Sequence, residues 1–262
     1  MKISLILKII INIRIMSGKL YRRDIEWFLK LFDNHFCFAR YNDGEWFCMR
    51  NLSGKNCDNH SFFPEMGKKI KDSITDKEVN NFNYIFQSSM YWGGEKEDIK
   101  KWGVCVDFVE RDYIHAISRK YPDIFINLMN KLNSRKLLLV GPFWLEDSEF
   151  IDPDFHIVIP KKNCFLYQDK ITKKIRDILK ENDNITVIFC SSMMTNCIIY
   201  DLYKEVDKKH TLVDFGSVFD LFIENKNIKY RLDNKDRKKI LEKYKDINTK
   251  NNEKVKTKII IN

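Results

Sequence analysis

The sequence contains few of the residues that separate domains and none of the spacings typical of metal-binding modules. It has nine glycines and five prolines among 262 residues, and neither a Pro/Gly/Ser-rich linker nor an internal repeat divides it. Its seven cysteines are an odd number without a C-x-x-C, and its five histidines show no H-x-x-x-H. These absences argue against a zinc-binding module, a repeat protein and a disulfide-stabilised scaffold. They favour a cytoplasmic protein with reduced thiols, folded as one large domain or two small ones.

The apolar segment near the N-terminus lacks the length of a membrane-spanning helix. Residues 3–16, ISLILKIIINIRIM, are interrupted by Lys8 and Arg14, whereas a spanning helix needs about 20 predominantly apolar residues. No small-x-small cleavage site follows the segment. Three interpretations stay open: translation from Met16, an appended structural segment, and a targeting segment such as a poor signal peptide or an interfacial helix.

Basic side chains do not outnumber acidic ones in the middle of the chain, although the net charge of the whole sequence is +9. Residues 1–23 carry six basic and no acidic side chains, residues 226–262 carry 13 basic and five acidic, and residues 24–225 carry 27 basic and 32 acidic. A nucleic-acid-binding protein normally concentrates its basic side chains on a folded face. The distribution therefore predicts solvated basic ends, no nucleic-acid partner, and at most weak attraction of the ends to an anionic membrane surface.

With 44% hydrophobic and 13% aromatic residues, the chain can bury a sizeable core. Short apolar runs that end at turn residues predict buried strands within 135–142, 155–160, 184–192 and 210–217. Helical spacing of apolar residues predicts helices over 168–182 and 193–206, between the last three runs. This alternation predicts an α/β fold, Rossmann-like and doubly wound, with a mainly parallel sheet and helices on both faces.

The ends of the chain are patterned differently. An amphipathic helix is expected at 24–32, a strand at 36–41, and mostly helix over 65–130 with a glycine-rich break at 91–95. The tail is rich in lysine and asparagine, which predicts one short helix at 234–245 and otherwise disorder. The predicted organisation is a basic apolar extension at 1–24, a folded domain at 25–225 and a basic tail at 226–262.

Polar and small residues follow the predicted strands. In open parallel sheets, ligands bind beyond the carboxyl ends of the strands, and four short loops lie there: 43–45, 141–144, 191–192 and 214–217. The first contains Asp43-Gly44-Glu45. In extended backbone, both carboxylates would point to the same side, so they could bind one Mg²⁺ or Mn²⁺ together with substrate phosphates. The alternative is an ordinary surface turn, because Asp-Gly is a common turn dipeptide.

Other candidates would bind anions. Ser191 and Ser192 follow a strand and precede a helix, so they are expected either to cap that helix or to present its free N–H groups to phosphate. Arg40 and Arg119 could each clamp a phosphate or form a surface ion pair. Asp214, Glu146 and Asp147 are the candidate general bases.

Several stretches resemble the GT-D-fold glycosyltransferases, a family first catalogued as a domain of unknown function. ARYNDGEW at 39–46 resembles that family's R-[FY]-G-D-G-E motif, and HAISRKYPD at 115–123 resembles its [TS]-R-x-Y segment. The runs at 136–144 and 158–171 resemble its middle strands, and the chain from 185 to 220 resembles its late strand, helix and D-x-G loop. Asn42 replaces a usual glycine, Ser217 stands where histidine is common, and Ser191-Ser192 replaces a glycine-led turn.

The resemblance implies transfer of a hexose, such as glucose, from a nucleotide-diphosphate sugar to a glycan or glycoprotein. A UDP-sugar is the expected donor. By this resemblance Asp43 and Glu45 become ligands of Mn²⁺ or Mg²⁺, and Asp43, Glu45 and Asp214 become catalytic. The expected donor-binding residues are Arg40, Arg119, Ser191, Ser192, Gly216 and Ser217. Three alternatives stay open: a non-catalytic nucleotide-sugar-binding protein with a decayed site, a metal-dependent phosphohydrolase, and a nucleic-acid- or membrane-associated module led by its basic ends.

Overall fold

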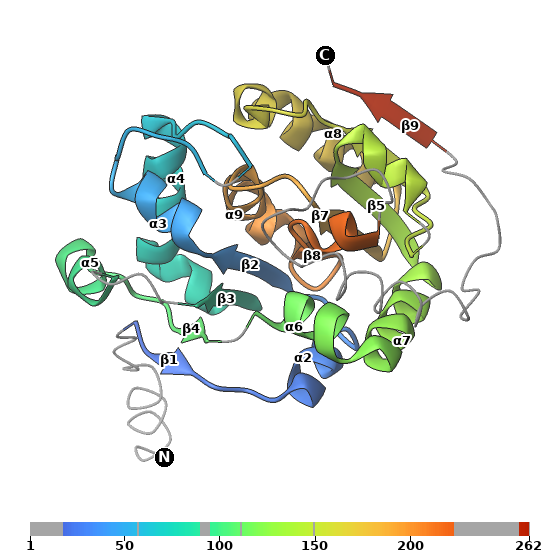
Figure 1. The fold of residues 1–262 in the computed structure, drawn as a ribbon, viewed down its shortest axis with the longest axis horizontal. Coiled ribbons are helices and arrows are strands. Elements are labelled where there is room, and N and C mark those ends of the chain that lie inside the picture. The colour runs from blue at the N-terminus through green and yellow to red at the C-terminus, as the bar shows by residue number, and fades with distance from the viewer. Residues whose placement is uncertain are drawn as a thin grey trace, which may run out of the picture.

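The centre of the molecule is one sheet of nine parallel strands (Figure 1). The computed structural model describes residues 18–56, 58–89, 95–110, 112–148, 150–222 and 257–261. Within them the strand order is β1-β4-β3-β2-β8-β7-β5-β6-β9. The strands are β1 (Leu20–Tyr21), β2 (Cys37–Tyr41), β3 (Tyr84–Ser88), β4 (Phe108–Val109), β5 (Lys136–Gly141), β6 (Phe155–Val158), β7 (Ile185–Phe189), β8 (Thr211–Asp214) and β9 (Thr257–Ile260).

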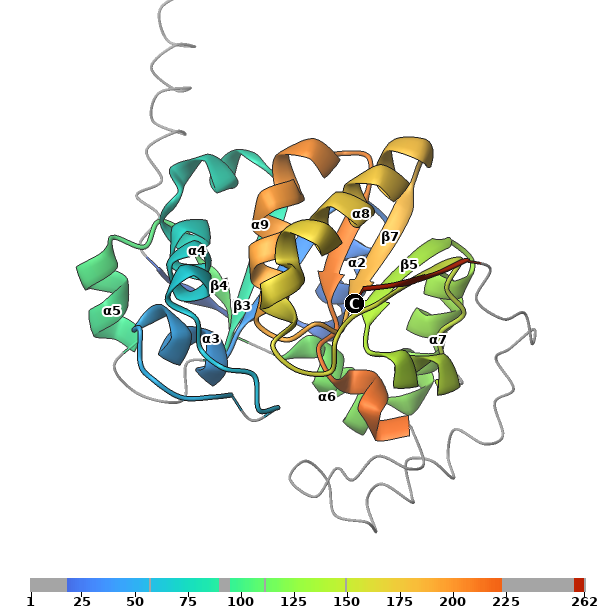
Figure 2. The same ribbon diagram turned by 90° about the horizontal axis from the view of Figure 1, so that it is seen from above.

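Helices cover both faces of the sheet, as the sequence predicted. Figure 2 shows α8 and α9 on one side of the strands and α6 and α7 on the other. The described α-helices are α2 (Ile25–Leu31), α3 (Asp43–Met49), α4 (Pro64–Thr75), α5 (Glu95–Trp102), α6 (Tyr113–Lys120), α7 (Pro122–Asn133), α8 (Gln168–Glu181) and α9 (Met194–Val206). Short 3₁₀ helices lie at Lys77–Asn81, Phe143–Asp147, Cys164–Tyr167 and Val218–Phe222. The fold class is confirmed.

Two hydrophobic clusters form the core because side chains of a strand alternate between the faces. In β2, Ala39 and Tyr41 pack with α4, α8 and α9, whereas Phe38 packs with α2, α6 and α7. β5 and β7 alternate in the same way. Their side chains are buried on both faces, which explains why these strands read as continuous apolar runs.

The middle of the chain holds more strand than predicted. The stretch 65–130 was expected to be mostly helical, but it contains β3 and β4, which pair with each other and join β2 to β1. β3 carries the polar residues Gln87 and Ser88 within five residues, and β4 has only two residues. Neither offers a long apolar run, so tertiary pairing rather than local pattern makes them strands.

The end of the tail is not disordered. β9 pairs in parallel with β6, Lys258 Nζ lies 2.6 Å from Glu146 Oε1, and Ile261 is buried in the core. The prediction of disorder is therefore wrong for 257–261, and both β1 and β9 lie outside the predicted domain range of 25–225. The predicted helix at 234–245 and the apolar segment at 3–16 lie outside the described residues. Among the described helices, none has both the length and the apolar composition needed to cross a bilayer.

Candidate active site

A cleft of about 760 Å³ opens at the carboxyl ends of the strands. Loops from β2, β5, β6, β7 and β8 line it, together with the start of α3 and residues of α6. β2 lies between β3 and β8, so the chain leaves β2 toward one side of the sheet and returns from the other. Such a reversal point is where doubly wound sheets bind ligands.

Nine of the eleven predicted site residues line this cleft. Those that line it are Arg40, Asp43, Glu45, Arg119, Ser191, Ser192, Asp214, Gly216 and Ser217. Of the other two candidate bases, Glu146 binds Lys258 and is not among the described residues that line the cleft, and the side chain of Asp147 is not described. The catalytic and binding roles of the nine residues stay predictions.

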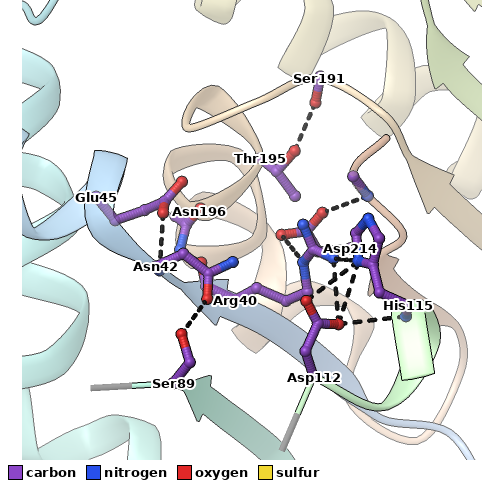
Figure 3. A network of polar contacts seen from close by, with 11 residues as sticks. Arg40, Asn42, Glu45, Ser89, Asp112, His115, Ser191, Thr195, Asn196 and Asp214 are labelled. Atoms are coloured by element: carbon purple, nitrogen blue, oxygen red, sulfur yellow. Dashed lines mark hydrogen bonds and ion pairs between the residues drawn. The ribbon is translucent and has the colours of Figure 1, made fainter. Parts of the chain in front are cut away.

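Arg40 is the centre of a buried polar network at the end of β2. Its Nη1 lies 2.8 Å from His115 Nδ1 and 3.6 Å from Asp112 Oδ1, and its Nε lies 3.5 Å from Asp214 Oδ2 (Figure 3). Burial alone would lower the pKa of Arg40, but Asp214 and Asp112 outweigh it and raise the pKa. The guanidinium is therefore a permanent cation neutralised by two carboxylates.

Gly216 and Asp214 shape the loop around this guanidinium. Asp214 Oδ1 accepts a hydrogen bond from the Gly216 backbone N at 2.9 Å, and Gly216 has φ of +55°. A Cβ atom at Gly216 would collide with the Arg40 guanidinium. The D-x-G sequence thus has a local reason: the aspartate fixes the turn, and only glycine leaves room for Arg40.

Asp214 is buried at 5% exposure. Burial raises its pKa, and the charge of Arg40 opposes that rise. A carboxylate with a raised pKa is a stronger base than an ordinary one, which suits general-base chemistry near neutral pH.

Sequence reasoning missed Asp112 and His115. Asp112 caps α6, because its carboxylate accepts a hydrogen bond from the His115 backbone N at 3.3 Å, and His115 lines the cleft. The available signal was Asp followed three residues later by His at a predicted helix start.

The predicted geometry of Asp43 and Glu45 is wrong. Residues 43–49 form α3 rather than extended backbone, with Asn42 as its N-cap. Glu45 Oε2 accepts a hydrogen bond from the Asn42 backbone N at 2.8 Å, which closes a capping box (Figure 3). Side chains two residues apart on a helix do not face each other. Both residues still line the cleft, but not as a pair projected from a strand.

Burial raises the pKa of Glu45 to about 7; the hydrogen bond from Asn42 and the charge of Arg40 oppose this rise, and Asp214 adds to it. The Glu45 carboxyl group therefore changes its protonation state near neutral pH, whereas an ordinary glutamate is fully ionised there.

Ser191 and Ser192 do not cap α9. The N-cap position belongs to Met193, and Ser192 has φ of +56°. Ser191 Oγ bonds Thr195 Oγ1 at 2.7 Å, and Ser192 Oγ accepts from Asn56 Nδ2 at 2.7 Å. The two serines instead brace the turn and tie it to the loop before α4, while still lining the cleft.

Lysines supply cationic charge at another part of the rim. Lys161 and Lys162 follow β6, are exposed, and line the cleft. Lys161 Nζ lies 5.8 Å from the centre of the Trp144 ring. Among the described residues, neither lysine forms an ion pair, so both charges are available to an anionic ligand.

Solved structures share this fold over nearly the whole chain. One, described as the highly conserved domain of unknown function 1792 with a distinct glycosyltransferase fold, matches with a TM-score of 0.58 at 16% identity, covering 94% of this chain and 97% of that one. The chain has the DUF1792 fold. A glycosyltransferase (DUF1792) from Streptococcus sanguinis matches with a TM-score of 0.54 at 17% identity, covering 82% of this chain and 88% of that one. No protein-family model and no curated protein matches the sequence.

The DUF1792 fold confirms the architecture that the sequence resemblance implied. At 16–17% identity it shows the fold alone. Donor, acceptor and metal dependence therefore rest on the residues of this cleft.

The cleft residues fit a divalent ion only in part. Among the described residues, no group of three or more His, Cys, Asp or Glu side chains could hold a metal. Asp43 and Glu45 offer hard oxygen ligands, and Mg²⁺ is commonly bound by one or two carboxylates plus substrate phosphates. The donor set therefore suits an ion that arrives with a diphosphate, not an ion held by the protein alone.

Proposed function

We propose that the protein is a glycosyltransferase that moves a hexose from a nucleoside-diphosphate sugar to a hydroxyl group of a glycan or glycoprotein. The observation that carries the proposal is the convergence of the nine predicted residues on one cleft, at the reversal point of a DUF1792-type sheet. The cleft combines acidic, cationic and apolar groups, as a nucleotide-sugar requires.

The cationic groups would bind the donor. Arg40 is already held by Asp112, His115 and Asp214, so it is better suited to organising the site than to clamping a phosphate alone. Arg119, Lys161 and Lys162 line the same cleft and would hold the diphosphate. Their positive charge would stabilise the negative charge that develops on the departing nucleoside diphosphate.

Asp214 would accept the proton of the attacking acceptor hydroxyl. Its position in the cleft and its raised pKa support this role. Asp43 and Glu45 would hold Mn²⁺ or Mg²⁺, whose charge would neutralise the diphosphate oxygens.

A non-catalytic nucleotide-sugar-binding protein is the second candidate. It is favoured by the capping role of Glu45, which occupies one of the two predicted metal ligands. A metal-dependent phosphohydrolase has no such support, since the described residues hold no cluster of metal-binding side chains.

Incubation with UDP-glucose, other UDP-hexoses, Mn²⁺ and mixed glycan acceptors tests the proposal. A glycosyltransferase forms a glycoside and releases UDP in equal amounts. Donor binding without turnover across the acceptor panel would favour the binding protein. Release of phosphate or sugar phosphate without glycoside would favour the hydrolase.

A further inference from the structure

The neighbours of His115 determine which of its ring nitrogens carries the proton. Its Nδ1 lies 2.8 Å from Arg40 Nη1, and 3.2 Å and 3.1 Å from Oδ1 and Oδ2 of Asp112. One ring nitrogen cannot both accept a hydrogen bond from the Arg40 guanidinium and donate one to the Asp112 carboxylate. A guanidinium always donates, and its contact is the shorter one, so Nδ1 is the acceptor.

The second ring nitrogen must then carry the proton. A neutral imidazole has one protonated nitrogen, and burial lowers the pKa of His115, which keeps the ring neutral. The Asp112 carboxylate keeps two other partners in this tautomer, because the His115 backbone N and Arg40 still face it. The Nε2–H group has no hydrogen-bond partner among the described residues, and the side chain, 13% exposed, lines the cleft.

The surroundings of this donor select its ligand. Asp112 and Asp214 flank Arg40 next to the imidazole. Arg40 compensates only one of these two negative charges, so a phosphate oxygen beside the imidazole would meet excess negative charge. A sugar hydroxyl would not be repelled by this charge, because it can accept from Nε2–H and donate to a carboxylate at once.

We propose that Asp112 and His115, organised by Arg40, form a subsite for the hydroxyl groups of the transferred sugar, with His115 Nε2–H as its neutral donor. The inference rests on the proposed function for the identity of its ligand. The diphosphate is then bound by Arg119, Lys161 and Lys162, as proposed above, and not by His115. His115 would be a binding residue that distinguishes a nucleotide-sugar from the bare nucleotide.

Nitrogen-15 NMR of the histidine side chains tests the tautomer on the full chain without ligand. The His115 resonances, assigned by their loss in His115→Asn, should show an unprotonated Nδ1 and a protonated Nε2. They should keep this pattern across neutral pH. A protonated Nδ1 would overturn the inference and leave the proposed function untouched.

Binding measurements with UDP and UDP-hexoses test the ligand. In His115→Asn, the amide can satisfy Arg40 at the Nδ1 position but lacks a donor at the Nε2 position. In His115→Gln, the longer amide restores that donor. We expect His115→Asn to weaken binding of the preferred UDP-hexose about tenfold and leave UDP binding unchanged, with His115→Gln recovering most of the loss. Lys162→Ala should weaken UDP and UDP-hexose alike.

Other outcomes decide against one proposal or the other. Equal UDP-hexose affinity for wild type and His115→Asn, both folded by thermal melting, would overturn the sugar contact. Equal weakening of UDP and UDP-hexose in His115→Asn would also overturn it, by making His115 a phosphate contact. If wild type binds none of the UDP-hexoses, the proposed function fails and the sugar assignment fails with it.

Discussion

Gly216 and Arg40 occupy positions that depend on each other: the guanidinium fills the space where any side chain at residue 216 would lie. Arg40 comes from β2 and Gly216 from the loop after β8, two neighbouring strands more than 170 positions apart in the sequence. In that space the guanidinium lies 3.6 Å from Asp112 Oδ1 and 3.5 Å from Asp214 Oδ2.

Replacing Gly216 by Ala should therefore cost more than backbone strain. Gly103 provides the matched control, because it has φ of +68° and open space around its Cβ position. Gly103→Ala should lower the free energy of unfolding by about 1 kcal/mol, and Gly216→Ala by clearly more, with loss of transfer activity. Urea denaturation of both variants measures the difference. Equal destabilisation would show that the guanidinium moves aside without cost.

Asp43→Ala should abolish most transfer while leaving the fold intact. Asp43 is the first residue of α3, is only partly buried, and lines the cleft. Loss of an electrostatic contact to the leaving diphosphate often costs about 10²–10³ in rate. Mn²⁺-dependent transfer and the melting temperature decide the matter. If Asp43→Ala instead keeps transfer activity within about threefold of wild type, Asp43 is not a metal ligand.

Glu45 needs two substitutions because it has two roles. Glu45→Ala should lose both the negative charge and the cap of α3, with a stability loss of about 1 kcal/mol. Glu45→Gln keeps an oxygen for the Asn42 N–H and removes only the charge. If the charge serves the reaction, both variants lose transfer, and only the first loses stability. Full activity in Glu45→Gln would restrict Glu45 to capping.

The stability of the protein should fall as pH rises because of Glu45. Its pKa is raised from 4.5 to about 7 in the folded protein. The contribution is therefore fully present below pH 4.5 and is lost as pH rises through about 7. It amounts to at most about 3 kcal/mol. Denaturation of wild type and Glu45→Gln at several pH values isolates it: the difference in free energy of unfolding between them should change across this window and stay constant outside it.

The C-terminal strand should contribute to stability through Ile261. Ile261 is 3% exposed, and its neighbour Ile260 is 57% exposed. Ile261→Asp buries a charge beside β6 and should cost several kcal/mol, whereas Ile260→Asp should cost less than about 0.5 kcal/mol. Thermal melting of the two variants compares them. Similar small effects would mean that β9 contributes little to the fold.

Local pattern explains which strands were predicted. The predicted strands are apolar runs bounded by turn residues, namely β2, β5, β6, β7 and β8. Such runs indicate by themselves that a strand is buried on both faces. β1, β4 and β9 lie at or near the edges and have two to four residues each. Their strand conformation comes from pairing with a neighbour, which no local window contains.

The sequence by itself determined the fold class and pointed to nine of the residues that line the cleft at the carboxyl ends of the strands. It could do so because strand ends and their polar loops are local features, and parallel strands bring those loops to one edge. Only the tertiary structure decided how the side chains are used. The place of Arg40 between two carboxylates and its contact with His115 depend on partners up to 174 residues away. Such contacts are set by packing, and packing has no signature in a short stretch of sequence.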